Sequence, residues 1–180
     1  MKQNNTRPHQ ASFRDPSGYM FYDGDVLRRA INPIYFKQYN ALKDSGFFKT
    51  LIKNKLLIPH IQTTVSDQQI VITPEPIAFI TNPYEWSFEQ YKHAALHTLK
   101  VHKYALSKGF ILKDASAYNV TFDKGSPVFI DTLSFDFYEK DTPWRAYKQF
   151  ITHFFGPLVL ASYHRTEIFK MLQTHIDGLP

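Results

Sequence analysis

Apolar and polar residues alternate in two short runs near the start of the chain, on either side of Asp23-Gly24. This dipeptide favours the positive φ angles of a type I′ turn, so the pattern predicts a β-hairpin over residues 18–31. Asn32-Pro33 then offers an N-cap with proline at the first helical position, and a helix is expected to about Lys43. A second helix is predicted over residues 47–55.

Two further apolar runs, at residues 69–73 and 77–80, are each typical of a short strand. Two prolines separate them, and proline cannot continue a ladder of backbone hydrogen bonds. The most regular helical pattern follows. Asn82 is its predicted N-cap, with proline at the first position and glutamate at the third, and Gly109 is its expected end. The predicted buried face has a spacing of three and four residues: Phe88, Tyr91, Ala95, Leu99, His102 and Leu106.

The last third of the chain predicts a small hairpin and a helix. Short strands are expected at residues 120–122 and 128–131, on either side of an Asp123-Lys124-Gly125 turn. Helical spacing resumes over residues 144–163, with a break at Gly156-Pro157.

Composition narrows the class of protein. The chain has 180 residues, of which 43% are hydrophobic and 16% aromatic, enough for one folded unit with two lobes. It has no cysteine, which excludes disulfides, thiolate zinc sites and a catalytic thiol. No apolar run is long enough to span a bilayer, so we expect a cytoplasmic protein without a membrane partner. The net charge of +5 suits a phosphate-bearing ligand, an acidic partner or nucleic acid alike.

Polar residues with a distinctive spacing lie between the long helix and the small hairpin. Asp114 lies five residues before Asn119, and Asp131 follows an apolar strand twelve residues after Asn119. Carboxylate and amide oxygens are ligands that Mg²⁺ accepts, with water and phosphate oxygens completing its octahedron. The alternative interpretation is that these side chains only hold turns.

The spacing, order and flanking elements of this segment resemble the protein-kinase-like superfamily, whose catalytic loop carries D-x-x-x-x-N and whose metal-binding aspartate follows the next hairpin. The resemblance implies that Asp114 orients or deprotonates an acceptor hydroxyl, and that Asn119 and Asp131 bind Mg²⁺. Lys113 would neutralise charge on the transferred phosphoryl group. ATP and an unidentified hydroxyl acceptor are the implied substrates.

Other features depart from that superfamily. Leu112-Lys113 replaces the usual His-Arg pair, and Thr132-Leu133 replaces Phe-Gly. The first hairpin has no glycine-rich loop and no lysine in its second strand. Arg29 is therefore the candidate phosphate contact, although a solvated strand residue is an equal alternative. Thr81 and Asn82 lie where the hinge would meet an adenine, or they form a plain link from strand to helix.

These inferences predict an α+β, protein-kinase-like fold. Residues 1–15 lack any period and are expected to form a mobile arm, with structure beginning near Ser17. Residues 16–80 would form a small lobe of β-hairpin and helices, and residues 81–180 a reduced helical lobe. ATP and Mg²⁺ are expected to bind between the two lobes.

Six segments also resemble a more particular family. SFRDPSGYMFYDG, INPIYFKQY, LLIPH, NPYEWSF, LKDASAYNV and IDTLSF are similar to the N-terminal region of bacterial class I S-adenosylmethionine-dependent methyltransferases. In those proteins the methyltransferase fold follows as a later domain. This chain contains no G-x-G, so the residues present do not support that activity. The competing interpretation is a non-catalytic, pseudokinase-like accessory domain of such a methyltransferase.

Three other possibilities have weaker support. His93 and His97 lie four residues apart and could share a metal, but packing or surface roles are more common for two histidines without a third ligand. Scattered lysines could contact nucleic acid, yet the aromatic residues do not interleave with them as stacking platforms would. Trp86 and Trp144 are expected to anchor the core.

Overall fold

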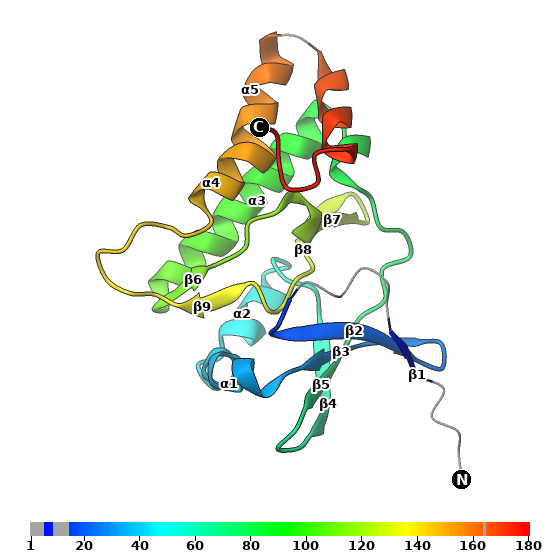
Figure 1. The fold of residues 1–180 in the computed structure, drawn as a ribbon, viewed down its shortest axis with the longest axis vertical. Coiled ribbons are helices and arrows are strands. Elements are labelled where there is room, and N and C mark those ends of the chain that lie inside the picture. The colour runs from blue at the N-terminus through cyan, green and yellow to red at the C-terminus, as the bar shows by residue number, and fades with distance from the viewer. Residues whose placement is uncertain (1–5, 9–14, 164) are drawn as a thin grey trace. The chain divides into compact units, whose positions relative to one another are not determined.

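A five-stranded antiparallel sheet, in the order β1-β2-β3-β5-β4, organises the first part of the chain. The computed structural model describes residues 6–8, 15–163 and 165–180 (Figure 1). The chain divides into one unit of residues 1–48 and 58–76 and another of residues 49–57 and 77–180. The chain passes between the units after Phe48, Leu57 and Pro76, so residues 49–57, which were predicted in the first lobe, belong to the second unit.

The strands of the first unit are short. Their bounds are β1 Thr6–Pro8, β2 Gly18–Asp23, β3 Val26–Ile31, β4 His60–Val65 and β5 Ile70–Pro74. Helix α1 (Phe36–Asp44) follows a 3-10 turn at Pro33–Tyr35, and α2 (Phe47–Lys53) begins after Gly46, whose φ is +72°. Asn32 precedes the turn as predicted, but its side-chain amide donates to Pro16 O at 2.9 Å and does not cap the helix.

Two predictions for the first unit need correction, and one strand was missed. Within the expected arm, β1 pairs with β2 from Thr6↔Asp23 to Pro8↔Phe21, because backbone pairing needs no hydrophobic period; the rest of the arm before Asp15 lies outside the described residues. The pair Asp23↔Val26 places Gly24 and Asp25 in the turn, and only Gly24 has a positive φ, the pattern of a type II′ turn. Strand β4 was not predicted at all.

The expected strand at residues 77–80 is wrong. Strand β5 runs to Pro74, and the next residues form no ladder, because prolines 74 and 76 have no N–H to donate. Phe79 and Ile80 are 68% and 48% exposed, so their apolar character does not reflect burial in a sheet.

The second unit is built around a long helix and two small hairpin-like sheets. Helix α3 (Phe88–Ser107) is followed by β6 (Phe110–Leu112), β7 (Val120–Asp123), β8 (Ser126–Phe129) and β9 (Phe135–Phe137). Strand β6 pairs with β9, and β7 pairs with β8. Short helical turns lie at Pro83–Glu85 and Ala117–Asn119, and a 3-10 helix at Thr166–Gln173. No helix in the described ranges is both long and apolar enough to cross a bilayer.

Helix α3 starts later than predicted, and its buried face is rotated. Asn82 and Glu85 form the predicted capping box, but around a 3-10 turn; extended backbone at Trp86 ends that turn, and Ser87 caps α3 itself. Leu99 and Leu106 are 38% and 39% exposed. Tyr91, Ala95 and His102 are buried as predicted, but small residues on the adjoining stripe take most of the other buried positions, where they permit close packing: Ala94, Thr98, Val101 and Ala105.

The predicted helix over residues 144–163 continues through its expected break. It consists of α4 (Tyr147–Phe150), a π-helical turn at Ile151–Phe155 and α5 (Gly156–Tyr163), which run alongside α3 in Figure 1. Gly156 N donates to Ile151 O, the wide spacing of a π-turn. Tyr91 of α3 contacts Phe154 of this turn edge-to-face and stacks on Phe169 with centroids 4.1 Å apart.

The glycines with positive φ give a matched test of packing in the second unit. Gly125 and Gly178 have φ of +79° and +100°, but a Cβ on Gly125 meets nothing within 4 Å, whereas one on Gly178 would lie 2.3 Å from Thr152 Oγ1. Gly125→Ala should lower the free energy of unfolding by about 1 kcal/mol, the cost of left-handed backbone alone. Gly178→Ala should cost about 2 kcal/mol or more, because it also expels the buried Leu179. Urea denaturation of both variants measures the difference, and equal losses would contradict it.

Candidate functional site

The loop after β6 carries the predicted catalytic residues. Lys113 follows the strand directly, and its backbone N–H donates to Ser134 O at 2.8 Å. The half-buried Asp114 carboxylate accepts from Ser116 N at 3.0 Å through Oδ1, and Ser116 Oγ accepts from Tyr118 N at 3.3 Å. These bonds turn the chain into the short 3-10 helix that ends at Asn119.

Two side chains, one from helix α4 and one from the π-turn, accept hydrogen bonds from the backbone of this loop. Gln149 Oε1 accepts from Ala115 N at 2.7 Å, and His153 Nδ1 accepts from Ala117 N at 3.4 Å. His153 is 1% exposed. Burial lowers its pKa, and a hydrogen bond to the Asp177 backbone and the charges of Asp114 and Asp177 oppose that shift. Sequence reasoning missed both residues, because their partners Ala115 and Ala117 lie 34 and 36 residues away along the chain.

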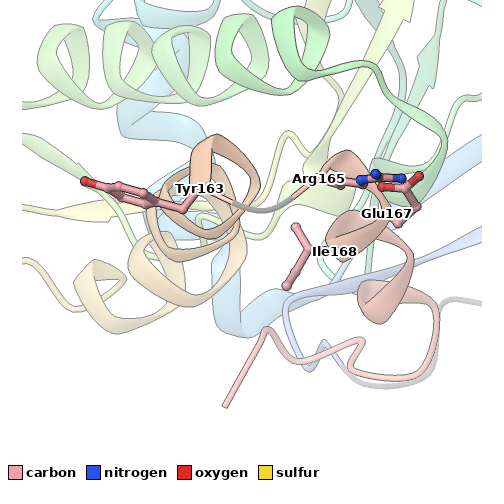
Figure 2. Close-up of a pocket in the computed structure, with 4 residues that line it drawn as sticks. All are labelled: Tyr163, Arg165, Glu167 and Ile168. Atoms are coloured by element: carbon pink, nitrogen blue, oxygen red, sulfur yellow. The ribbon is translucent and has the colours of Figure 1, made fainter.

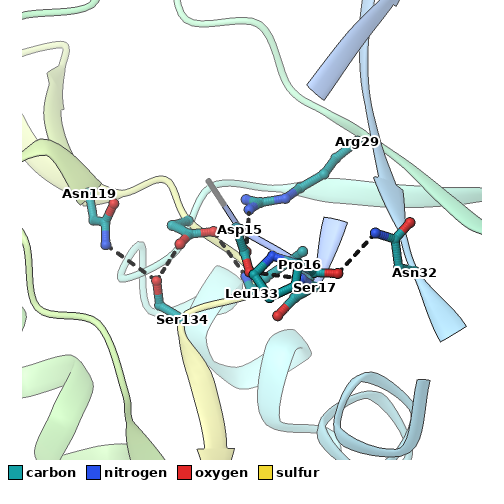
Figure 3. A network of polar contacts seen from close by, with 9 residues as sticks. Asp15, Pro16, Ser17, Arg29, Asn32, Asn119, Leu133 and Ser134 are labelled. Atoms are coloured by element: carbon teal, nitrogen blue, oxygen red, sulfur yellow. Dashed lines mark hydrogen bonds and ion pairs between the residues drawn. The ribbon is translucent and has the colours of Figure 1, made fainter. Parts of the chain in front are cut away.

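The two predicted metal ligands are joined through a serine. Asp131 lies two residues beyond β8, and its Oδ1 accepts from Leu133 N at 3.0 Å. Ser134 Oγ donates a short hydrogen bond to Asp131 Oδ2 and accepts one from Asn119 Nδ2 at 3.3 Å. Figure 3 shows the Asn119 amide and the Ser134 hydroxyl directed toward each other. The structure thus brings Asn119 and Asp131 together, although they lie twelve residues apart.

These oxygens suit Mg²⁺ better than a metal that demands a complete protein cage. Among residues 6–8, 15–163 and 165–180, no group of three or more His, Asp or Glu side chains could hold an ion. Mg²⁺ commonly uses one or two protein oxygens and takes the rest from water and phosphate. Asn119 and Asp131 would supply those two, and when bound the ion would neutralise charge on phosphate oxygens.

The predicted adenine contacts are engaged within the second unit. Thr81 N donates to Thr121 Oγ1 at 2.9 Å, and Thr81 Oγ1 accepts from Trp86 Nε1 at 3.0 Å. Asn82 N donates to Glu85 Oε2 at 2.6 Å. Both backbone donors are therefore occupied within the second unit, and a role of these two residues in adenine binding stays a prediction.

The predicted phosphate contact, Arg29, lies on β3 of the first unit. Its Nη2 is 3.7 Å from Asp15 Oδ2, and its side chain is 12% exposed (Figure 3). It is therefore more buried than a solvated strand residue, and a role in phosphate binding stays a prediction.

The histidine pair on α3 does not form a shared site. His97 is buried, and its Nε2 lies 2.9 Å from Leu56 O, whereas His93 is exposed. Burial lowers the pKa of His97. The two side chains have different environments, so packing and surface roles explain them.

An open depression on the second unit has none of the predicted site residues in its lining. Tyr163, Arg165, Glu167 and Ile168 line it, at the start of the C-terminal 3-10 helix (Figure 2). Three of these four side chains are exposed, and no buried polar group points to a ligand there. We assign it no function.

The environment of His102 predicts a pH dependence of stability. Its ring stacks on Trp144 at 4.0 Å, and its Nδ1 forms no hydrogen bond with any residue in the described part of the chain. Burial lowers the pKa of His102 to about 4. The unfolded state therefore binds a proton at His102 near pH 6.5, whereas the folded state binds it only near pH 4. The free energy of unfolding therefore falls as the pH falls between these values, and His102 contributes at most about 3 kcal/mol to this loss.

Replacing this histidine should flatten that dependence. His102→Phe keeps an aromatic ring against Trp144 without a titrating nitrogen, and the exposed His93→Phe on the same helix is the matched control. Urea unfolding at intervals from pH 7 to 4 should show a smaller loss of unfolding free energy in His102→Phe than in the wild type. Identical slopes in all three proteins would contradict the assignment.

Comparison with known proteins shows similarity to one part of a longer protein. No protein-family model matches it. It is similar to the nodulation protein NoeA of Rhizobium meliloti (strain 1021), with 32% identity over 176 residues. The match covers 94% of this chain but 37% of NoeA, so the chain resembles one part of a larger protein.

Proposed function

We propose that this chain is a protein-kinase-like module that binds ATP with Mg²⁺ through the loops of its second unit. The observation that carries the proposal is the hydrogen-bonded link from Asn119 through Ser134 to Asp131. Through one serine it links the Asn119 amide and the Asp131 carboxylate, the two groups whose oxygens bind the cation in phosphoryl-transfer sites of this type. Turn formation alone gives no reason for two turns to share this serine.

The order of elements supports the same proposal. Helix α3, the loop with Asp114, the β7–β8 hairpin and Asp131 follow one another as the resemblance implies. Because β1 precedes the first hairpin, Arg29 lies on the third strand, the strand that carries the phosphate-contacting lysine in protein kinases. Helix α1 follows that strand, although Asp44 at its end is its one acidic residue.

In the proposed reaction, Asp114 orients a hydroxyl acceptor and takes its proton as the acceptor oxygen bonds to the γ-phosphorus and ADP leaves. Asp114 Oδ1 is fixed by Ser116 N, and Oδ2 makes no hydrogen bond within the described residues. Lys113, which precedes Asp114 in the sequence, would neutralise charge on the transferred phosphoryl group. Positioning of this kind supplies most of the catalysis in phosphoryl transfer.

A non-catalytic accessory module is the second candidate. Asp114 and Asp131 both hold turns, and the backbone donors of Thr81 and Asn82 are engaged internally. NoeA is much longer than the aligned region, so a module of this kind would act on another domain of the same protein. A methyltransferase domain is the proposed partner, from the resemblance of the six sequence segments.

The first prediction concerns ligand binding. Millimolar ATP with Mg²⁺ should raise the thermal stability of the wild-type chain, by about 2.7 kcal/mol at 100 times the dissociation constant. Asp131→Asn should lose the Mg²⁺-dependent part of this shift, because it removes a charged ligand. Asp123→Asn, at an exposed aspartate in the same unit, is the control and should behave as the wild type. The absence of any shift in the wild type would refute nucleotide binding.

A second prediction separates the two candidates. If the module is catalytic, the wild type should hydrolyse ATP slowly with water as acceptor, and Asp114→Asn should reduce that rate by about 100-fold or more while the thermal shift with ATP and Mg²⁺ remains. Phosphate release measures the rate. A wild type that binds the nucleotide without turnover would favour the accessory module.

A further inference from the structure

We propose that Ser134 is a positioning residue that fixes the orientation of the Asn119 amide and so leaves the amide oxygen, and not the nitrogen, available to the cation. The inference rests on the proposed binding of Mg²⁺ and adds a residue that the sequence resemblance does not assign. It follows from the direction of two hydrogen bonds.

The Ser134 hydroxyl has a single proton, so it can donate one hydrogen bond. Ionised Asp131 can only accept hydrogen bonds, so the short contact between Ser134 Oγ and Asp131 Oδ2 uses that proton. Ser134 Oγ can then only accept from Asn119. The partner must be the Asn119 NH₂ group, which lies 3.3 Å away.

The Asn119 amide oxygen is left without a partner among the described residues by this arrangement. With Nδ2 directed at Ser134, Asn119 Oδ1 must point away from the serine, and it accepts no hydrogen bond from any residue that the structure describes. An amide nitrogen cannot bind Mg²⁺, whereas an amide oxygen can. The hydroxyl therefore selects the amide orientation in which Asn119 is able to act as a ligand.

Backbone hydrogen bonds hold Ser134 and Asn119 in place. Ser134 O accepts from Lys113 N at 2.8 Å, and Asn119 O accepts from Ile130 N at 2.8 Å. Ser134 is 1% exposed, so bulk water has little access to replace its hydroxyl. Without the hydroxyl, the Asn119 amide could rotate about χ2, a torsion with a broad energy well, and would sample both orientations.

Electron paramagnetic resonance measures the binding of Mn²⁺, which replaces Mg²⁺ in the experiment, to the full chain in the presence of ATP. Ser134→Ala should raise the Mn²⁺ dissociation constant by about 10-fold or more, the usual effect of removing a group that orients a metal ligand. Ser134→Thr, which keeps the hydroxyl, should stay close to the wild type. Urea unfolding without metal verifies that the variants are folded, and Ser134→Cys replaces the alanine variant if that one is not.

A second variant isolates the orientation of the amide. Asn119→Asp presents an oxygen whichever way the side chain turns, so in this background Ser134→Ala should change the Mn²⁺ dissociation constant by less than about 3-fold, and the cycle measures the coupling. In the absence of metal, the NMR signals of the Asn119 side-chain NH₂ should exchange faster with water in Ser134→Ala than in the wild type.

The outcomes separate this inference from the proposed function. Wild-type binding that Ser134→Ala leaves unchanged, or an equal loss in the wild-type and Asn119→Asp backgrounds, would overturn the role of Ser134 and leave cation binding intact. A wild type that binds no Mn²⁺ with ATP would overturn both proposals together.

Discussion

The loop around Asp114 is irregular backbone that lies partly buried, so its N–H groups must find partners outside regular secondary structure. Lys113 N bonds to Ser134 O, Ala115 N to Gln149 and Ala117 N to His153. Each buried donor left unsatisfied would cost about 1–3 kcal/mol. The position of Asp114 therefore depends on two elements distant in sequence, the segment after β8 and the helix that contains the π-turn.

The π-turn connects this loop to the C-terminal segment. His153 accepts from Ala117 N, and Tyr91 of α3 donates a short hydrogen bond to His153 O. Leu179 N donates to Thr152 O at 3.0 Å on the same turn. A π-turn widens the helix by one residue per turn, and such features are frequent at functional sites. Here it lets one turn serve the loop, the long helix and the chain end.

Sequence reasoning selected Asn119 and Asp131 as candidate ligands because chemistry restricts which residue types can bind a cation; the structure links both to Ser134, and their role as ligands stays a prediction. It located the β7–β8 hairpin because Lys124 and Gly125 adopt the positive φ angles that such a turn requires. It failed for Ser134, Gln149 and His153, since each is defined by a partner that only the tertiary structure brings near. It failed at residues 77–80, where a strand was predicted from apolar character despite the two prolines. It also failed at Leu99 and Leu106, which were predicted to be buried, because periodicity alone does not distinguish adjoining stripes of one helix.

The interpretation of these side chains as turn formers and the interpretation as ligands are compatible. The bonds from Leu133 N and Ser134 Oγ to Asp131 shape the turn, and a carboxylate with about four lone-pair sites can accept hydrogen bonds and bind a cation together. The same bonds that shape the turn hold the carboxylate next to Ser134. In Asn119 the division is clearer, because the amide nitrogen serves the structure and the oxygen is left for a ligand. Hydrogen bonds within the site therefore describe how it is preorganised, and measurements of bound metal decide whether that preorganisation is used.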